Sequence, residues 1–316
     1  MENSINPELN SNSLNSIFNE KLPSARSIFG ASWNFYFAKF KIIFNILILP
    51  TLFAVLSTLI AVYISPEKQI SAEGIDITPP MSLEPAIVII ILNIINIIIQ
   101  FFSTLAMWNF AYYGDEYIKS AKEAYIYAFK KWGLFIWVGV LVSFYVFGGF
   151  FLFLIPGVLF ALWFSLASSI ALFENVKGLE ALARSREYIR GQIGVVYFRF
   201  FVLSLILFLF IAATNIITGI LALINFYLSI SINVFIFNLI LIPLSHIQAI
   251  FLFKEIQFRR ANKVLVVGEQ KMKKLLIVPL VGILLLIAVI TIFGRDLYNE
   301  ILNYNMEYKK NYSRNY

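Results

Sequence analysis

The feature that most constrains this chain is a run of 54 consecutive residues, 200–253, without a single Asp, Glu, Lys or Arg. Four further uncharged runs follow the same pattern, at 42–66, 85–114, 132–173 and 275–294. One helical crossing of a bilayer needs about 20 apolar residues. Charged residues make up 14% of the chain, against roughly 25% in soluble domains. These runs exclude a soluble enzyme and a disordered chain, and predict an all-α polytopic membrane protein.

At about 20 residues per crossing, the five runs predict seven membrane spans. Three runs are single spans, at 42–64, 85–110 and 274–293. Residues 132–173 must form a hairpin, and helix-breaking residues place its turn near Gly148-Gly149 and Pro156-Gly157. Residues 200–253 must also cross twice, with a turn expected between Thr214 and Asn233.

The distribution of basic residues predicts the orientation of the spans. With the N-terminus inside, the cytoplasmic segments hold 20 of the 25 Lys and Arg residues, as the positive-inside rule requires. We therefore expect a multi-pass protein of the plasma membrane with its N-terminus in the cytoplasm and its C-terminus outside. The predicted regions are a polar, disordered tail (1–24), a six-span membrane domain (25–262), a basic linker with the seventh span (263–294) and a polar outer tail (295–316).

The cytoplasmic segments between spans are short and amphipathic. Residues 120–132 and 177–192 both carry a Glu-Ala pair followed four residues later by a small residue. An apolar face over 28–40, before the first span, gives a weaker third copy. Such segments can lie in the headgroup plane with basic side chains toward anionic lipid. We predict a threefold repeat of an amphipathic elbow helix followed by a membrane hairpin.

The basic residues of these elbow segments are candidate contacts for phospholipid headgroups. They are dense beside the spans, and the candidates are Lys130, Lys131, Arg184, Arg186 and Arg190. The alternative is that they belong to ordinary cytoplasmic loops whose charge serves only topology.

Several motifs carry a resemblance to a known family. They are Leu154-Ile-Pro-Gly157, Leu172-Phe-Glu174, Gly178-Leu-Glu-Ala181, Arg184-Ser185, Tyr188-Ile-Arg-Gly191, Ile242-Pro243 and Phe253-Lys-Glu-Ile-Gln-Phe-Arg259-Arg260. Over about 25–262 the chain resembles the membrane domain of bacterial glycerophosphoryl diester phosphodiesterases and related bacterial polytopic membrane proteins. The resemblance implies a six-span helical domain, to which the seventh span is an addition. It does not imply the hydrolase activity, because that belongs to a separate barrel with paired histidines, and this chain has one histidine.

Polar residues inside predicted spans are the default place to seek function. Asn93, Asn96, Gln100 and Ser103 recur at helical spacing on one face of the second span. They could line a polar pathway or a lipid-headgroup cleft, although we favour hydrogen bonding between helices. None of them is charged, which argues against a proton or ion relay.

Two further polar residues have a structural interpretation. His246 follows Pro243, and we expect it to cap backbone groups that the proline frees. A pH sensor or a metal ligand is the alternative, but no Asp, Glu, Cys or second His lies nearby in the sequence. Glu174 ends the fourth span and is expected to pair with Lys177 or with a basic residue of the following elbow helix.

Motifs for phosphate binding, metalloprotease or serine hydrolase chemistry are absent from the sequence. We predict a non-enzymatic envelope protein without a cofactor that handles lipids or scaffolds a membrane complex. Its expected partners are membrane lipids and a membrane protein, and not nucleic acid. The alternative is a small transporter or permease subunit that uses the polar face of the second span. A membrane-embedded transferase or hydrolase ranks last, because no carboxylate is expected to be buried in the membrane.

Overall fold

The computed structural model of the chain describes residues 24–65, 83–190, 193–260, 273–274, 276–288 and 290–292. These residues form helices and turns, with no strand among them. The labelled helices are α2 (Ala25–Ala38), α3 (Phe40–Ile64), α4 (Leu83–Tyr113), α5 (Ala121–Leu152), α6 (Leu154–Trp163), α7 (Ala167–Glu174), α8 (Gly178–Ile189), α9 (Ile193–Ala222), α10 (Phe226–Ile236), the π-helix η1 (Phe237–Leu241) and α11 (Ile242–Arg260).

Six helical segments are long and apolar enough to cross a membrane. They are α3, α4, α5, α6 with α7, α9, and α10 through α11. This confirms the predicted all-α polytopic class, and the chain is a multi-pass integral membrane protein. The predicted seventh span coincides with a shorter apolar helix, Ile277–Ile292. The predicted tails at 1–24 and 295–316 lie outside the described residues, apart from Ser24.

Both predicted hairpins are confirmed. The first turns at Phe153, between α5 and α6, and Pro156 falls in the first turn of α6, where a missing N–H costs no helical hydrogen bond. A Cβ added at Gly149 would lie 2.9 Å from the backbone nitrogen of Gly157, so small residues allow the two helices to approach closely. The second hairpin turns before Asn225, whose side chain accepts from the Leu228 N–H and caps α10.

The elbow segments differ from one another in one respect. α2 and α8 are separate helices, but the segment at 120–132 is the beginning of the 32-residue α5. The predicted helix is therefore present, and it continues without a break into the span that follows it. No proline interrupts α5, and a continuous helix satisfies its own backbone groups as it enters the hydrocarbon.

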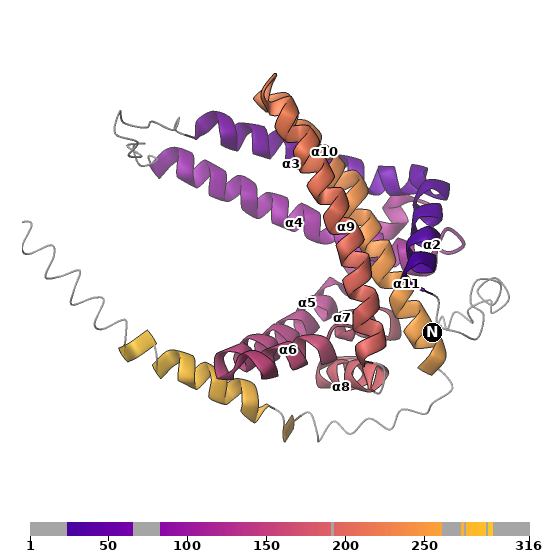
Figure 1. Cartoon of the computed structure of the whole chain (residues 1–316), viewed down its shortest axis with the longest axis vertical. Helices are drawn as coiled ribbons and strands as arrows, with labels where there is room; N and C mark the ends of the chain where they lie inside the picture. Colours follow the sequence, from indigo (N-terminus) through magenta and orange to yellow (C-terminus); the bar gives the residue numbers. More distant parts are fainter. Residues whose placement is uncertain are drawn as a thin grey trace, which may run out of the picture. The chain divides into compact units, whose positions relative to one another are not determined.

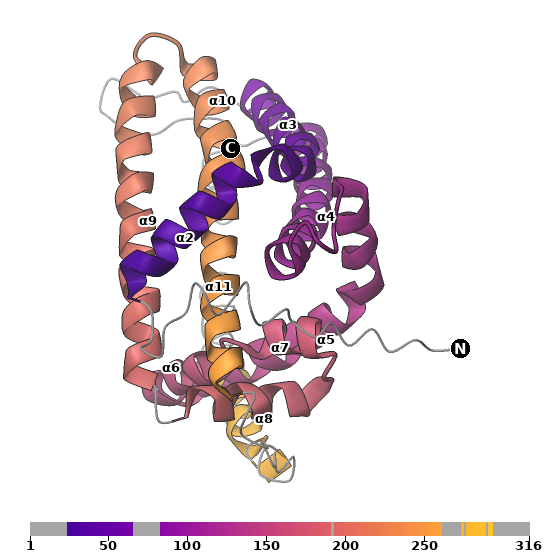
Figure 2. The same cartoon turned by 90° about the vertical axis from the view of Figure 1, so that its right-hand side faces the viewer.

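The chain divides into two compact units. Unit 1 comprises Met1–Trp132 with Gly194–Asn262, and unit 2 comprises Gly133–Ile193 with Lys263–Tyr316. Within unit 1, α3 packs against α4 and α10, while α11 packs against α4 and α2 (Figures 1 and 2). Within unit 2, α8 packs against α6 and α7.

Two prolines interrupt the helical hydrogen bonding of unit 1. Because proline has no N–H, the carbonyl four residues earlier loses its helical donor. Pro50 thereby frees the Ile46 carbonyl, and the Tyr125 hydroxyl donates to this oxygen at 2.7 Å. An unsatisfied carbonyl inside a bilayer would cost several kcal/mol, so the tyrosine stabilises the broken span.

Pro243 is compensated in the same way. It frees the carbonyl of Leu239, which accepts the hydroxyl of Tyr36 at 2.7 Å. Tyr36 lies on α2 and is buried. The prediction that His246 caps the group freed by Pro243 is therefore wrong, because a tyrosine from a distant helix occupies that position.

A double-mutant cycle tests this compensation. Tyr125→Phe should lower the free energy of unfolding by about 1 kcal/mol, because the Ile46 carbonyl loses its donor. In the Pro50→Ala background the same change should cost much less, since the substituted residue supplies a backbone N–H to that carbonyl. Unfolding of the four proteins in one detergent measures the coupling. Equal costs in both backgrounds would contradict the assignment.

Candidate functional site

An open pocket of about 650 Å³ lies within unit 1, between α3, α4, α10, η1 and α11. Its polar lining consists of uncharged side chains, and no charged side chain is among the described residues around it. The lining residues are Ala54, Thr58, Asn96, Gln100, Thr104, Asn233, Val234, Phe237, Asn238, Ile242, Ser245 and His246. On α4 these positions lie near the middle of the candidate span Leu83–Tyr113, away from both of its ends.

Amide side chains hold one wall of the pocket together. Gln100 Nε2 donates to Asn238 Oδ1 at 2.8 Å, which joins α4 to η1. Asn233 Nδ2 donates to Thr218 Oγ1 at 3.0 Å and to Asn215 Oδ1 at 3.1 Å, which joins α10 to α9. The interhelical hydrogen bonding favoured for this polar face is therefore present, and it shapes the pocket.

Two lining residues carry buried polar atoms without a hydrogen-bond partner among the described residues. They are Asn96 Oδ1 and His246 Nε2. The His246 ring lies edge-on to Trp108, with 6.0 Å between ring centroids. Leaving a buried polar group unpaired costs about 1–3 kcal/mol, so a ligand that pairs with either atom would recover this cost. Both atoms have less than 1 Å² of accessible surface, so the side chain must turn toward the pocket for a ligand to reach them.

The predicted polar face is divided by the structure. Asn96, Gln100 and His246 line the pocket. Asn93 is exposed and donates to the Ile89 carbonyl of its own helix at 2.9 Å, and Ser103 is buried outside the lining. No sequence pattern indicated the pocket's other two asparagines, Asn233 and Asn238, which stand five residues apart. Asn238 lies in the π-helix η1, and π-helical turns often occur at functional sites.

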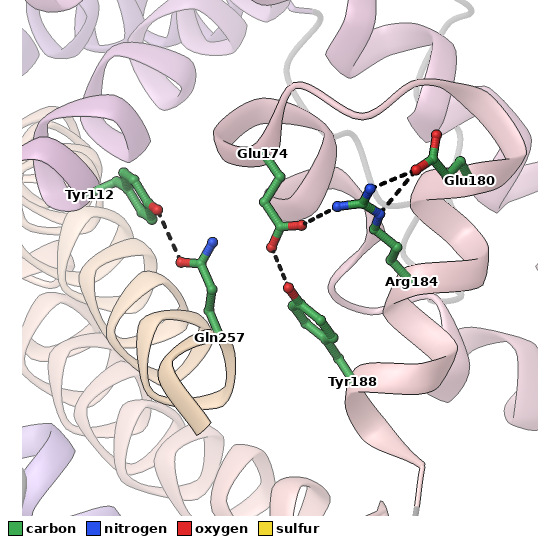
Figure 3. Close-up of polar contacts among 6 residues, drawn as sticks. All are labelled: Tyr112, Glu174, Glu180, Arg184, Tyr188 and Gln257. Atoms are coloured by element: carbon green, nitrogen blue, oxygen red, sulfur yellow. Dashed lines mark hydrogen bonds and ion pairs between the residues drawn. The ribbon is translucent and has the colours of Figure 1, made fainter. Parts of the chain in front are cut away.

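In unit 2, an ion-pair network joins α8 to the end of α7 (Figure 3). Arg184 contacts Glu174 at 3.2 Å and Glu180 at 2.7 Å, and the Tyr188 hydroxyl donates to Glu174 at 2.7 Å. Partial burial alone would lower the pKa of Arg184, but hydrogen bonds to the two carboxylates raise it. The expected pairing of Glu174 with the next elbow helix is confirmed.

The other candidate headgroup contacts differ in exposure. Arg186 lies over the Trp163 ring, 4.3 Å from its centroid. The Arg190 side chain is 73% exposed and 3.4 Å from Glu187. In unit 1, Lys130 is exposed and Lys131 is half-buried. Headgroup binding by these residues stays a prediction, with Arg190 and Lys130 the most accessible of them.

A buried charge cluster joins α9 to α11 in unit 1. Arg199 lies 3.3 Å from Glu255, and the two side chains are only 8% and 3% exposed. Arg259 approaches the same Glu255 oxygen at 3.4 Å. The expectation that the chain has no buried carboxylate is therefore wrong, although Glu255 lies near the C-terminal end of α11 and not at the middle of the span. The partners stand 56 residues apart, so no local pattern indicated the pair.

Further polar contacts cluster at the end of α4. The Tyr112 hydroxyl donates to Gln257 Oε1 at 3.0 Å (Figure 3), and Lys254 Nζ lies 5.1 Å from the centroid of the Tyr112 ring. Just beyond α4, Asp115 pairs with Lys39, and this hydrogen bond lowers the pKa of the Asp115 carboxyl. These contacts tie α4 to α11 and to the segment between α2 and α3.

Metal binding finds little support in these groups. Within the described ranges, no three His, Cys, Asp or Glu side chains come together as a metal ion would require. Comparisons with family models, curated proteins and solved structures found no match to this chain. The resemblance drawn from the sequence motifs thus stays a prediction, and any functional proposal rests on the chemistry of the pocket itself.

Removing the buried carboxylate should be costly. Glu255→Gln leaves Arg199 and Arg259 without their shared counter-charge and should lower the free energy of unfolding by about 3 kcal/mol. Replacing both Arg199 and Glu255 by Leu should cost much less, because no buried charge is stranded. Glu187→Gln, which affects an exposed pair, is the control and should change stability by less than about 0.5 kcal/mol. A double variant as unstable as Glu255→Gln would contradict this account.

Arg184 and Arg190 should respond differently to neutralisation. Arg184→Gln breaks two ion pairs and should lower the thermal unfolding midpoint in detergent. Arg190→Gln should leave the midpoint unchanged and reduce the anionic lipid that co-purifies with the protein, which lipid mass spectrometry measures. If Arg190→Gln retains as much anionic lipid as the parent chain, the predicted headgroup contact at Arg190 is wrong.

Proposed function

We propose that this chain is a non-enzymatic protein of the plasma membrane that binds lipid inside the bilayer. Its N-terminus is cytoplasmic in this proposal. The observation that carries it is the uncharged polar pocket of unit 1 near the middle of the candidate span α4. Most ligand sites combine an apolar lining with a few polar groups that orient the ligand, and this pocket has both.

The surroundings of the pocket support a ligand that comes from the bilayer. On α4, large apolar side chains near Asn96 are exposed, including Ile94, Ile97 and Ile98. In a bilayer these side chains contact lipid, and the pocket is open rather than enclosed. A lipid can therefore enter from the hydrocarbon without crossing a polar surface.

The residue types at the pocket support a non-enzymatic role. His246 is the only titratable residue among its lining residues, and neither a carboxylate nor a nucleophile activated by a base accompanies it. The nearby hydroxyls of Thr58, Thr104 and Ser245 therefore serve better as hydrogen-bonding groups than as reactive ones.

Transport of a small solute is the second candidate. Transporters bind their substrates near the bilayer midplane, and this pocket lies near the middle of the candidate span α4. A transporter should move solute across a sealed vesicle, whereas a lipid-binding protein should not. The two functions are therefore separated by flux and not by binding alone.

Native purification followed by lipid mass spectrometry tests the proposal. The parent chain should retain a lipid above the level of the surrounding bilayer, and Asn96→Leu should lose most of it, because this change removes a polar lining group. Asn93→Leu is the matched control, since Asn93 lies one turn away, is exposed and bonds only to its own helix. Equal lipid retention by the two variants would contradict the proposal.

A further inference from the structure

We infer that the pocket binds an uncharged lipid with a free hydroxyl group, of the diacylglycerol class. This inference rests on the proposed lipid-binding function and names its ligand. It follows from three properties of the pocket: the charge of its lining, the hydrogen-bonding groups it offers and the exposed apolar side chains of α4 beside it.

The charge of the lining excludes ionised lipids. None of the lining residues is Lys, Arg, Asp or Glu. A phosphate or a carboxylate buried in the bilayer without a counter-charge would be very costly. The charged clusters of unit 1, around Glu255 and around Asp115, involve none of the lining residues. The occupant is therefore neutral.

The hydrogen-bonding groups favour a ligand that donates. Asn96 Oδ1 can only accept a hydrogen bond, and it has no partner in the described part of the chain. A lipid hydroxyl can donate to it once the buried Asn96 amide turns toward the pocket that the residue lines. The ester carbonyls of the same lipid can accept from an amide or hydroxyl group of the lining, such as the hydroxyl of Thr104. Diacylglycerol combines one donor with ester acceptors.

The apolar lining and the opening suit the rest of such a molecule. Part of the pocket wall is apolar and consists of Ala54, Val234, Phe237 and Ile242. A volume of about 650 Å³ lies within the usual range of ligand sites, and it accommodates the glycerol region while the acyl chains extend into the bilayer. A neutral headgroup also leaves the interface at less cost than an ionic one.

Competition in nanodiscs tests the ligand class. The purified full chain in phosphatidylcholine nanodiscs is labelled with a photoactivatable diacylglycerol, and three unlabelled lipids with the same acyl chains compete. Diacylglycerol should compete best. Its 3-O-methyl ether has lost the hydroxyl donor, so an about tenfold higher concentration of it should be needed to reduce labelling by half. Phosphatidic acid should compete more weakly still.

The outcomes separate the inference from the proposed function. Equal competition by diacylglycerol and its methyl ether, or stronger competition by phosphatidic acid, would overturn the ligand class while leaving lipid binding intact. Labelling of Asn96→Leu should fall about tenfold relative to Asn93→Leu. If both variants label like the parent chain and no lipid competes, the proposed function itself fails. The competition arm uses the unaltered chain, so it decides the ligand class even if Asn96→Leu does not fold.

Discussion

The need to satisfy every backbone polar group in hydrocarbon governs the construction of unit 1. Pro50 and Pro243 each remove one backbone hydrogen bond from a span near the pocket. Tyrosine hydroxyls from other helices donate to the two carbonyls that are left without a partner. The donors come from α2 and from the first turns of α5. These amphipathic segments therefore do more than lie beside the spans, because they supply the hydrogen bonds that allow the spans to be irregular.

Charged and uncharged polar groups occupy different depths of unit 1. Arg199 and Glu255 lie close to the ends of their helices and neutralise one another. The middle of the spans holds amides, hydroxyls and one histidine. This arrangement follows from the free-energy cost of burying polar groups in hydrocarbon. A buried charge needs both a partner and nearby water, whereas a buried amide needs only a hydrogen-bond partner. The middle of the bundle can therefore be polar without being charged.

The sequence predicts the helical class, six of the spans and both hairpin turns because these depend on local properties: apolar length and helix-breaking residues. The helical spacing of Asn96 and Gln100 likewise indicated part of the pocket. Its other wall was not predictable, because Asn233 and Asn238 fall on different faces of a regular α-helix and so follow no helical spacing. The tyrosine caps and the Arg199–Glu255 pair depend on tertiary contacts over 56 to 203 residues, which no local pattern carries.

The irregularity around the pocket fits the proposed binding role better than a purely structural one. A bundle that needed only stability would keep α10 and α11 as one regular helix. Instead the chain contains a π-helix and a proline at this wall, and it leaves Asn96 Oδ1 without a partner among the described residues. Each feature costs stability on its own. A hydrogen-bonding ligand offsets the cost of the unpaired atom, so the same residues that weaken the apo bundle are those that a bound lipid would stabilise.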